Sequence, residues 1–238
     1  YLSTHPGITE RLSLLEAHLK SLPRAQRDRR DDDRRFLRVR TLIWARYGDA
    51  QHAEQVFSSM SAKEPMRFLG MGILSARRNR VPEAREAFDR ALRLAPRDEL
   101  ILREAGIFQY NMGDAGQARK LLETALRLDP DDYMGLFFYA RLLDDSGQSD
   151  KALQTYGKVL RHVPEDAEVH TYYGRSLGKN NQPFAGYLHL AYAALYSNDG
   201  RRADSWLDKA RPLAVTEAEK RDLTHFEEKL SARRKLWK

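Results

Sequence analysis

The sequence predicts an all-α fold, a right-handed superhelical solenoid of antiparallel helix pairs with about 12–13 helices. Two observations carry this prediction. Three prolines, Pro96, Pro130 and Pro164, recur at intervals of 34 residues, and the same series of small and large side chains precedes each of them. A fixed period of this length is typical of repeat proteins in which each helix pair stacks on the next.

The series before each proline predicts a closely packed helix. Its members are Ala84, Phe88 and Ala91, then Ala118, Leu122 and Ala125, then Ala152, Tyr156 and Val159. The small residue admits a neighbouring helix, and the large residue four positions later fills the space beside it. We therefore expect these side chains to lie where the two helices of a unit cross.

Another helix is predicted upstream in each unit. It is marked by Phe68, Met71 and Gly72, by Leu102, Ala105 and Gly106, and by Leu136, Tyr139 and Ala140. Turn residues separate the two helices, at Asn79-Arg80, Met112-Gly113-Asp114 and Ser146-Gly147-Gln148. The prolines are followed by Asp98, Asp132 and Asp166. A carboxylate at these positions is expected to cap the next helix by accepting hydrogen bonds from its free amides.

This order of helix, tight turn, helix and proline resembles the tetratricopeptide family, most strongly over residues 65–164. The resemblance implies a repeat region at 32–216, preceded by an N-terminal segment and helix at 1–31 and followed by a capping helix at 217–238. The expected units are 33–64, 65–98, 99–132, 133–166 and an irregular 167–216.

Both flanks depart from the strict period. Ala53 and Phe57 fit the small and large positions of the first unit, which is about three residues short. A helix at 183–198 fits both the second helix of one unit and the first helix of another. We expect it to serve both units, which shifts the solenoid by half a repeat. Thr216 and Glu219 predict a capping box for the last helix.

The composition restricts the class of protein. The chain has 238 residues and no cysteine, which excludes disulfides and thiolate metal sites. No apolar run reaches the roughly 20 residues that a membrane-spanning helix needs, and no secretory signal is visible. Because the chain begins at Tyr1 rather than at a methionine, within what reads as a structured segment, we expect a fragment or a processed product.

The net charge of +7 comes mostly from arginine, with the densest run between Arg24 and Arg40. Asp28 and Asp31 to Asp33 interrupt this run, and mixed signs at helical spacing predict a solvated face. Nucleic-acid binding is the alternative interpretation. No recognised nucleic-acid motif accompanies the charge, so we expect no nucleic-acid partner.

Motifs of catalysis are absent from the sequence. It holds seven histidines but no HExxH, P-loop or GxSxG pattern. His170 and His189 fall at repeat positions that predict packing. We expect this chain by itself to catalyse no reaction and to hold no metal or cofactor.

The first helix of each unit is expected to line a concave groove that binds an extended or helical peptide. By repeat position, the groove residues are Met66, Leu69, Ile73, Arg103, Ile107, Tyr110, Phe137, Arg141, Thr171 and Arg175. This apolar stripe with guanidinium groups suits a protein or peptide ligand that has apolar side chains and a carboxylate. Alternatively, these residues pack on a neighbouring element, such as the N-terminal helix or a missing domain.

The carboxylate clamp of chaperone-binding members of the family is missing. Its lysine, arginine and asparagine positions hold Leu69, Ile73, Glu104, Met134 and Phe138. We therefore expect no binding to the acidic C-terminal tail of a chaperone.

The first residues, Tyr1-Leu2-Ser3-Thr4-His5-Pro6 and Ile8-Thr9-Glu10-Arg11-Leu12, do not fit the repeat. They resemble the segment that closes the catalytic domain in bacterial zinc metallopeptidases with C-terminal tetratricopeptide repeats, the family of the periplasmic β-barrel assembly-enhancing protease. The stretch from Gly186 to Tyr196, followed by Gly200-Arg201-Arg202-Ala203, is similar to the C-terminal half of that family.

This resemblance implies an interaction module that follows a zinc-dependent metalloendopeptidase domain and recruits substrates or envelope assembly partners for proteolysis or quality control. It implies the bacterial periplasm or cell envelope, with zinc held by the upstream domain. His5 either reaches that zinc or only orders the Thr4-His5-Pro6 turn. A free-standing tetratricopeptide scaffold with no enzymatic domain is the alternative.

Overall fold

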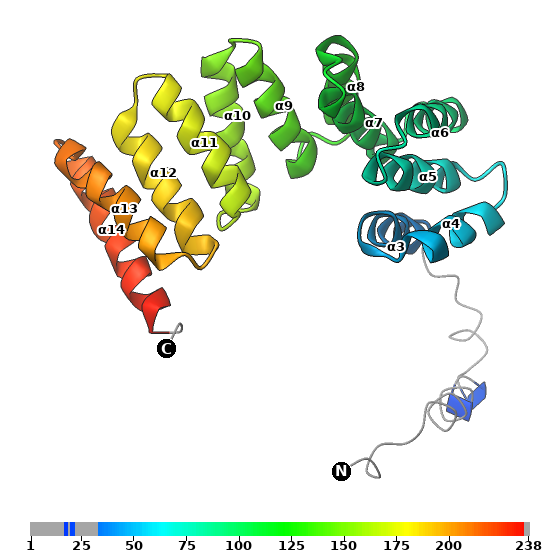
Figure 1. Ribbon diagram of the computed structural model, residues 1–238, viewed down its shortest axis with the longest axis horizontal. Helices are drawn as coiled ribbons and strands as arrows, with labels where there is room; N and C mark the ends of the chain where they lie inside the picture. Colours follow the sequence, from blue (N-terminus) through cyan, green and yellow to red (C-terminus); the bar gives the residue numbers. More distant parts are fainter. Residues whose placement is uncertain (1–16, 19, 22–32, 236–238) are drawn as a thin grey trace.

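The computed structural model describes residues 17, 18, 20, 21 and 33–235, and its stacked helices form an arch (Figure 1). The helices are α3 (Asp33–Tyr47), α4 (Ala50–Ser59), α5 (Pro65–Arg77), α6 (Val81–Leu94), α7 (Glu99–Asn111), α8 (Ala115–Leu128), α9 (Tyr133–Asp145), α10 (Ser149–His162), α11 (Ala167–Lys179), α12 (Pro183–Tyr196), α13 (Gly200–Ala210) and α14 (Glu217–Arg234). A 3-10 turn at Arg211–Leu213 precedes α14. The described ranges contain no strand, and the predicted all-α, right-handed superhelical solenoid is confirmed.

The regular part of the solenoid consists of the pairs α5–α6, α7–α8 and α9–α10, and each first helix also contacts the next first helix. The turn inside each pair contains one residue with positive φ. These residues are Asn79, Gly113 and Gly147, with φ of 56°, 80° and 73°, and Asn181, in the turn between α11 and α12, has a φ of 58°. Glycine and asparagine tolerate this left-handed conformation better than other residues. The turn chemistry therefore repeats with the same 34-residue period as the prolines.

The predicted series of small and large residues forms the core of these pairs. All nine side chains are at most 3% exposed. The helices cross so closely that a Cβ added at Gly72 would lie 3.1 Å from the Phe88 ring, and one at Gly106 would lie 2.9 Å from Leu122. Burial of these side chains supplies most of the driving force for stacking, because it removes apolar area from water.

Two of the three aspartates expected as N-caps make the expected bond. Asp98 accepts from the amide of Ile101 at 3.0 Å, and Asp166 accepts from the amide of Val169 at 2.9 Å. Asp132 stands at the N-cap of α9 without a side-chain cap bond, and its carboxylate accepts a hydrogen bond from Arg103. The capping box of Thr216 and Glu219 is present at α14.

The array shifts at α12. This helix packs against α11 on one side and α13 on the other, and α14 then contacts both α12 and α13. Asn198, in the turn before α13, has positive φ and follows Asn181 by 17 residues, half the period. At the α11–α12 crossing, a Cβ on Gly174 would lie 2.8 Å from the Gly186 carbonyl oxygen. One helix thus completes two pairs.

The first two described helices differ from the pair expected over 33–64. Ala53 and Phe57 are buried as expected, but α3 packs mainly along α5 and contacts α4 much less. The cause is the short unit, because α4 has only 10 residues and is joined to α3 by Gly48 and Asp49. The expected segment at 1–31 lies almost entirely outside the described residues, so its division from the repeats stays a prediction.

Candidate peptide-binding site

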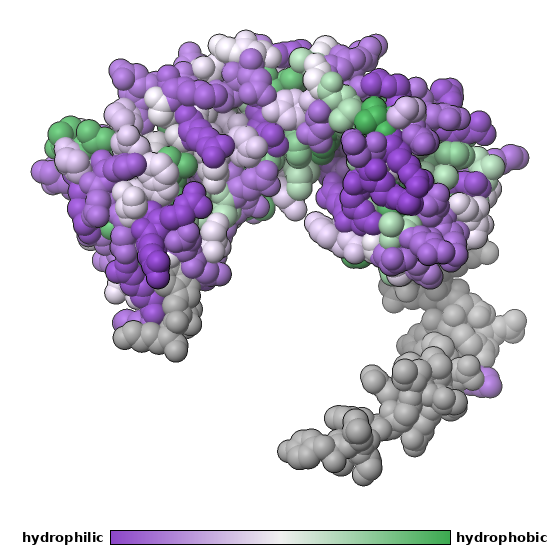
Figure 2. Space-filling model, in the orientation of Figure 1, coloured by the Kyte–Doolittle hydropathy of each residue, from purple (hydrophilic) through white to green (hydrophobic). Residues whose placement is uncertain are grey.

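A pocket of about 450 Å³ lies on the inner side of the arch, between the first helices α5, α7 and α9. Its apolar wall includes Ile73, Ala76, Phe88, Ile107, Phe108, Met112, Met134 and Phe138. Its charged rim is formed by Arg46, Arg77, Glu104 and Glu168. Figure 2 shows a face that is largely hydrophilic, with small hydrophobic patches scattered over it, one of them on the inner side near the middle of the arch. The pocket can enclose a large apolar side chain of a ligand.

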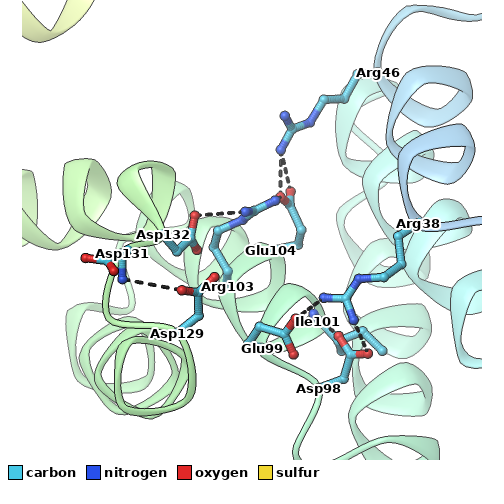
Figure 3. Close-up of polar contacts among 10 residues, drawn as sticks. All are labelled: Arg38, Arg46, Asp98, Glu99, Ile101, Arg103, Glu104, Asp129, Asp131 and Asp132. Atoms are coloured by element: carbon cyan, nitrogen blue, oxygen red, sulfur yellow. Dashed lines mark hydrogen bonds and ion pairs between the residues drawn. The ribbon is translucent and has the colours of Figure 1, made fainter. Parts of the chain in front are cut away.

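Glu104 is the centre of a charge network beside this pocket (Figure 3). Arg46 reaches it from α3 with Nη2 2.7 and 2.8 Å from the two carboxylate oxygens. Arg103 donates from Nη2 to the same carboxylate at 2.7 Å and from Nη1 to Asp132 at 3.0 Å. The network ties α3 to α7 and to the start of α9, so it fixes the relative positions of the pocket walls.

Burial and charge oppose each other in this network. Glu104 is 4% exposed and the Arg103 side chain is 14% exposed, so each loses much of its hydration. Burial lowers the pKa of Arg103. The negative charges of Glu104 and Asp132 raise this pKa by more than burial lowers it, so the pKa of Arg103 lies above its ordinary value. The guanidinium of Arg103 is therefore committed to internal carboxylates and is not free for a ligand.

A second link joins the same helices. Arg38 of α3 donates from Nη1 to Asp98 at 3.1 Å and also binds Glu99 (Figure 3). Both acidic residues belong to the start of α7, so these ion pairs tie α3 to α7 as well as to its neighbour α5.

Arg141 is enclosed by aromatic rings rather than by carboxylates. Its guanidinium carbon lies 4.2 Å from the Tyr172 ring centroid and 5.0 Å from those of Tyr110 and Phe138. Its Nε is buried without a hydrogen-bond partner among the described residues. Cation–π attraction stabilises this arrangement and links α7, α9 and α11.

Tyr110 is held by the same cluster. Its hydroxyl donates to Asp145 at 2.6 Å. Burial and this hydrogen bond raise the pKa of Tyr110 to about 12, although the nearby Arg141 opposes the shift. Tyr110 therefore stays neutral and acts as a hydrogen-bond donor at physiological pH.

The structure separates the predicted groove residues into three groups. Ile73 and Ile107 line the pocket. Met66, Leu69 and Phe137 are at most 5% exposed and pack in the core. Leu69 and Met66 belong to the cluster on which Leu37 and Leu42 of α3 pack.

The remaining predicted residues lie elsewhere on the inner face. Arg103 binds Glu104 and Asp132, and Tyr110 and Arg141 lie in the aromatic cluster of α7, α9 and α11. Thr171 and Arg175 line a separate hollow of about 240 Å³ with Leu190 and Trp206, between α11, α12 and α13. The predicted set is thus distributed over two hollows and a packed core, and its contact with a ligand stays a prediction.

Sequence reasoning left several pocket residues out of the predicted groove, although it assigned Glu104, Met134 and Phe138 to the positions of the missing clamp. Glu104 and Phe138 are separated by one period of 34 residues, so the repeat register could have placed both on the same inner face. Met134 has its counterpart one period earlier at Leu100. No repeat signal could have found Arg46, because α3 contributes it through an irregular packing.

The described residues contain no group of three or more histidine, cysteine, aspartate or glutamate side chains that could hold a metal ion. His5 lies outside the described part of the chain. No helix in that part is long and apolar enough to cross a membrane.

Comparisons with known proteins agree with this geometry. Residues 109–175 match the family model described as tetratricopeptide repeat, so the chain contains repeats of this class. No curated protein sequence matches the chain.

Among solved structures, MamA from Desulfovibrio magneticus RS-1, residues 41 to the end, is similar with a TM-score of 0.56 at 18% identity, covering 71% of this chain and 97% of that one. MamA AMB-1 gives a TM-score of 0.57 at 19% identity, covering 68% and 98%. YrrB, described as a tetratricopeptide protein with an unusual peptide-binding site, has a TM-score of 0.54 at 17% identity, covering 71% of this chain and 89% of that one. At these identities the likeness concerns the fold.

Proposed function

We propose that this chain is a protein-interaction scaffold that binds a peptide segment of its partner through the inner pocket between α5, α7 and α9. The observation that carries the proposal is the pocket itself, an apolar cavity of about 450 Å³ with a charged rim on the concave face. A cavity of this kind favours one large apolar anchor residue, since anchors buried in a pocket supply most of the affinity of such interfaces.

The charges around the pocket add to this preference. Arg46 and Glu104 neutralise each other, so they restrict the shape of the pocket without attracting a charge. Arg77 and Glu168 stand on the rim from α5 and α11. We therefore expect the bound segment to carry an aromatic or long aliphatic residue flanked by polar residues, without a requirement for a terminal carboxylate.

The similarity to YrrB supports the class of function only, because the unusual peptide-binding site described for YrrB belongs to that protein. The similarity to the MamA structures covers nearly all of those chains. This coverage favours a free-standing scaffold over a module attached to an enzyme. The proposed site rests on the pocket residues of this chain.

The proposal is tested with random peptides displayed on phage. Selected peptides are labelled and titrated by fluorescence anisotropy against the wild type and against the double variant Ile73→Ser, Met134→Ser. Both residues are half-buried in the pocket wall, and because Ile73 also packs against the core, the folded state of the variant is checked by circular dichroism. Affinity is expected to fall about tenfold or more, since losing an anchor contact costs at least about 1.4 kcal/mol.

The matched control is Leu94→Ser, Leu128→Ser, which makes the same kind of change at the ends of α6 and α8, where the two side chains are 38% and 44% exposed. Peptide affinity should stay unchanged in the control. Equal affinities for both double variants, with helicity intact by circular dichroism, would show that peptides do not bind in this pocket.

The connection to a zinc metalloendopeptidase, with a periplasmic or envelope location, stays a proposal that rests on the resemblance of residues 1–12 and 186–203. Its test is independent of the pocket. An HExxH motif on a helix about 100–200 residues upstream of Tyr1 in the same reading frame would support it, and an upstream frame without this motif would remove it.

A further inference from the structure

The hollow of about 240 Å³ between α11, α12 and α13 has one face of α12 as its floor. The floor residues stand at positions i, i+3, i+4 and i+7 of that helix and are Leu190, Ala193, Ala194 and Ser197. One wall belongs to α11 and the other to α13, since α12 packs against both of these helices (Figure 1). The shift of the repeat at α12 therefore creates this hollow, because one helix here has a partner on each side.

Each wall of the hollow contributes one arginine. Arg175 stands on α11 four residues after Thr171, and Arg202 stands on α13 four residues before Trp206. Residues at this spacing share one face of a helix. Among the described residues that line the hollow, none is acidic. We call the four floor residues and these four wall residues together the α12 hollow.

The two arginines of the α12 hollow keep most of their charge available. Arg175 is exposed and forms no ion pair within the described part of the chain, and its guanidinium carbon lies 6.0 Å from the Tyr172 ring centroid. Arg202 pairs only loosely with Asp199, whose Oδ2 lies 3.9 Å from the arginine Nε. By contrast, Arg103 is bound by two carboxylates at 2.7 and 3.0 Å. Two unneutralised cations beside one hollow attract an anion.

Trp206 gives the hollow an apolar wall that is held in place. Its indole stacks on the Tyr187 ring with the centroids 5.8 Å apart and 20° between the planes. The Nζ atom of Lys209 lies 4.3 Å from the indole centroid and adds a third positive charge nearby. An apolar wall and floor beside guanidinium groups suit a ligand group that has both methylene groups and a carboxylate. The small volume limits this group to about one side chain.

We infer that the α12 hollow binds the carboxylate side chain of an acidic residue of the partner protein, with glutamate as the best fit. Arg175 and Arg202 donate charge-assisted hydrogen bonds to the carboxylate from the two walls. The floor and the Trp206 ring contact the methylene groups of the side chain. This site extends the proposed scaffold function and rests on the chain's binding a protein, but it does not depend on the inner pocket.

The indole N–H of Trp206 reports binding in heteronuclear NMR spectra of the full chain. The protein has three tryptophans, so the signal is assigned with Trp206→Phe, and Trp44 on α3 serves as an internal reference. The probes are N-acetylglutamate N-methylamide and its neutral match, N-acetylglutamine N-methylamide, at constant pH and ionic strength. The glutamate probe should shift the Trp206 signal until the site is saturated, and the glutamine probe should not shift it.

Two double variants of equal net charge separate the site from a general charge effect. Arg175→Gln, Arg202→Gln should weaken binding of the glutamate probe about tenfold or more, since it removes the charge-assisted bonds. Arg161→Gln, Arg201→Gln is the matched control, because both arginines are exposed on α10 and α13 and lie outside the hollow. Its affinity for the probe should equal that of the wild type.

The outcomes that would overturn the inference are distinct. They are an unmoved Trp206 signal, or equal affinities for the two double variants with helicity intact by circular dichroism. A response to inorganic phosphate or to N-acetylalanine as strong as that to the glutamate probe would also overturn it, since the hollow would then bind a free anion or a chain terminus. None of the described residues that line the inner pocket is a tryptophan, so this result is independent of the peptide titrations that test that pocket.

Discussion

The imidazole rings of His170 and His189 share a hydrogen bond between their Nδ1 atoms, 2.8 Å apart, across the α11–α12 crossing. His170 Nε2 lies 3.0 Å from the Pro164 carbonyl oxygen, which can only accept. His170 therefore carries its proton on Nε2 and accepts at Nδ1, and His189 donates from its own Nδ1. This assignment makes both rings neutral and agrees with the packing role expected from the repeat position.

Acid should destabilise the protein through this pair. Burial lowers the pKa of His170, and burial together with the neighbouring His170 lowers the pKa of His189 to about 3. When the pKa of a histidine is lower in the folded state, its neutral form contributes fully to folding stability at pH values above the unfolded-state pKa of about 6.5. This contribution is lost as the pH falls toward the folded-state pKa. The nearby Lys229 also opposes protonation of His170, while Asp166 favours it.

The measurement is urea unfolding between pH 7.5 and pH 5. Wild type should lose about 1–3 kcal/mol over this range, and His189→Gln should lose less because one titrating ring is absent. His225→Gln is the control, since His225 is exposed on α14. An identical pH dependence in wild type and His189→Gln would contradict this account.

Removal of Arg103 should cost much more than removal of an exposed arginine. Arg103→Ala leaves Glu104 with one partner and Asp132 without its ion pair, in surroundings where both carboxylates are at most 9% exposed. The free energy of unfolding should fall by about 3–5 kcal/mol. Arg211→Ala breaks the exposed pairs with Asp208 and Glu227 and should cost about 0–1 kcal/mol. If chemical denaturation gave similar losses of unfolding free energy for Arg103→Ala and Arg211→Ala, burial would not explain the contribution of Arg103.

Two glycines of α11 should respond to alanine in opposite directions. A Cβ at Gly174 would lie 2.8 Å from the Gly186 carbonyl oxygen. Because this oxygen belongs to the backbone of α12, the clash can be relieved only if α11 and α12 move apart. At Gly178, no atom lies within 4 Å of the added Cβ. Gly178→Ala should therefore stabilise by about 0.5–1 kcal/mol through helix propensity, and Gly174→Ala should lower the melting temperature.

Phe137→Ala should destabilise the fold and is therefore a poor probe of binding. The ring is 5% exposed and contacts the rings of Tyr156 and Tyr172 at centroid distances of 6.3 and 5.5 Å. Its loss should cost about 3–5 kcal/mol in chemical denaturation. A loss below about 1 kcal/mol would mean that the site relaxes around the missing ring. Met134 and Ile73 are better positions for testing a ligand.

The regular repeats could be predicted from the sequence because their determinants are local. The positions Ala84, Phe88 and Ala91 and their counterparts recur with one period, and every counterpart is buried in the same way. The inner pocket could be predicted only in part. Ile73 and Ile107 follow the period, but the side chains of Met66, Leu69 and Phe137 follow it too and are buried by neighbouring helices.

The sequence by itself determined the helical repeat, its turns and most of its caps, because each depends on residues within about one turn of helix. It also determined that α12 fits two registers. The tertiary structure alone decided that α3 lies along α5, that Arg46 joins Arg103 on Glu104, and that Asp132 binds Arg103 instead of capping α9. These relationships join residues 29 to 58 positions apart, and their geometry depends on how whole helices pack.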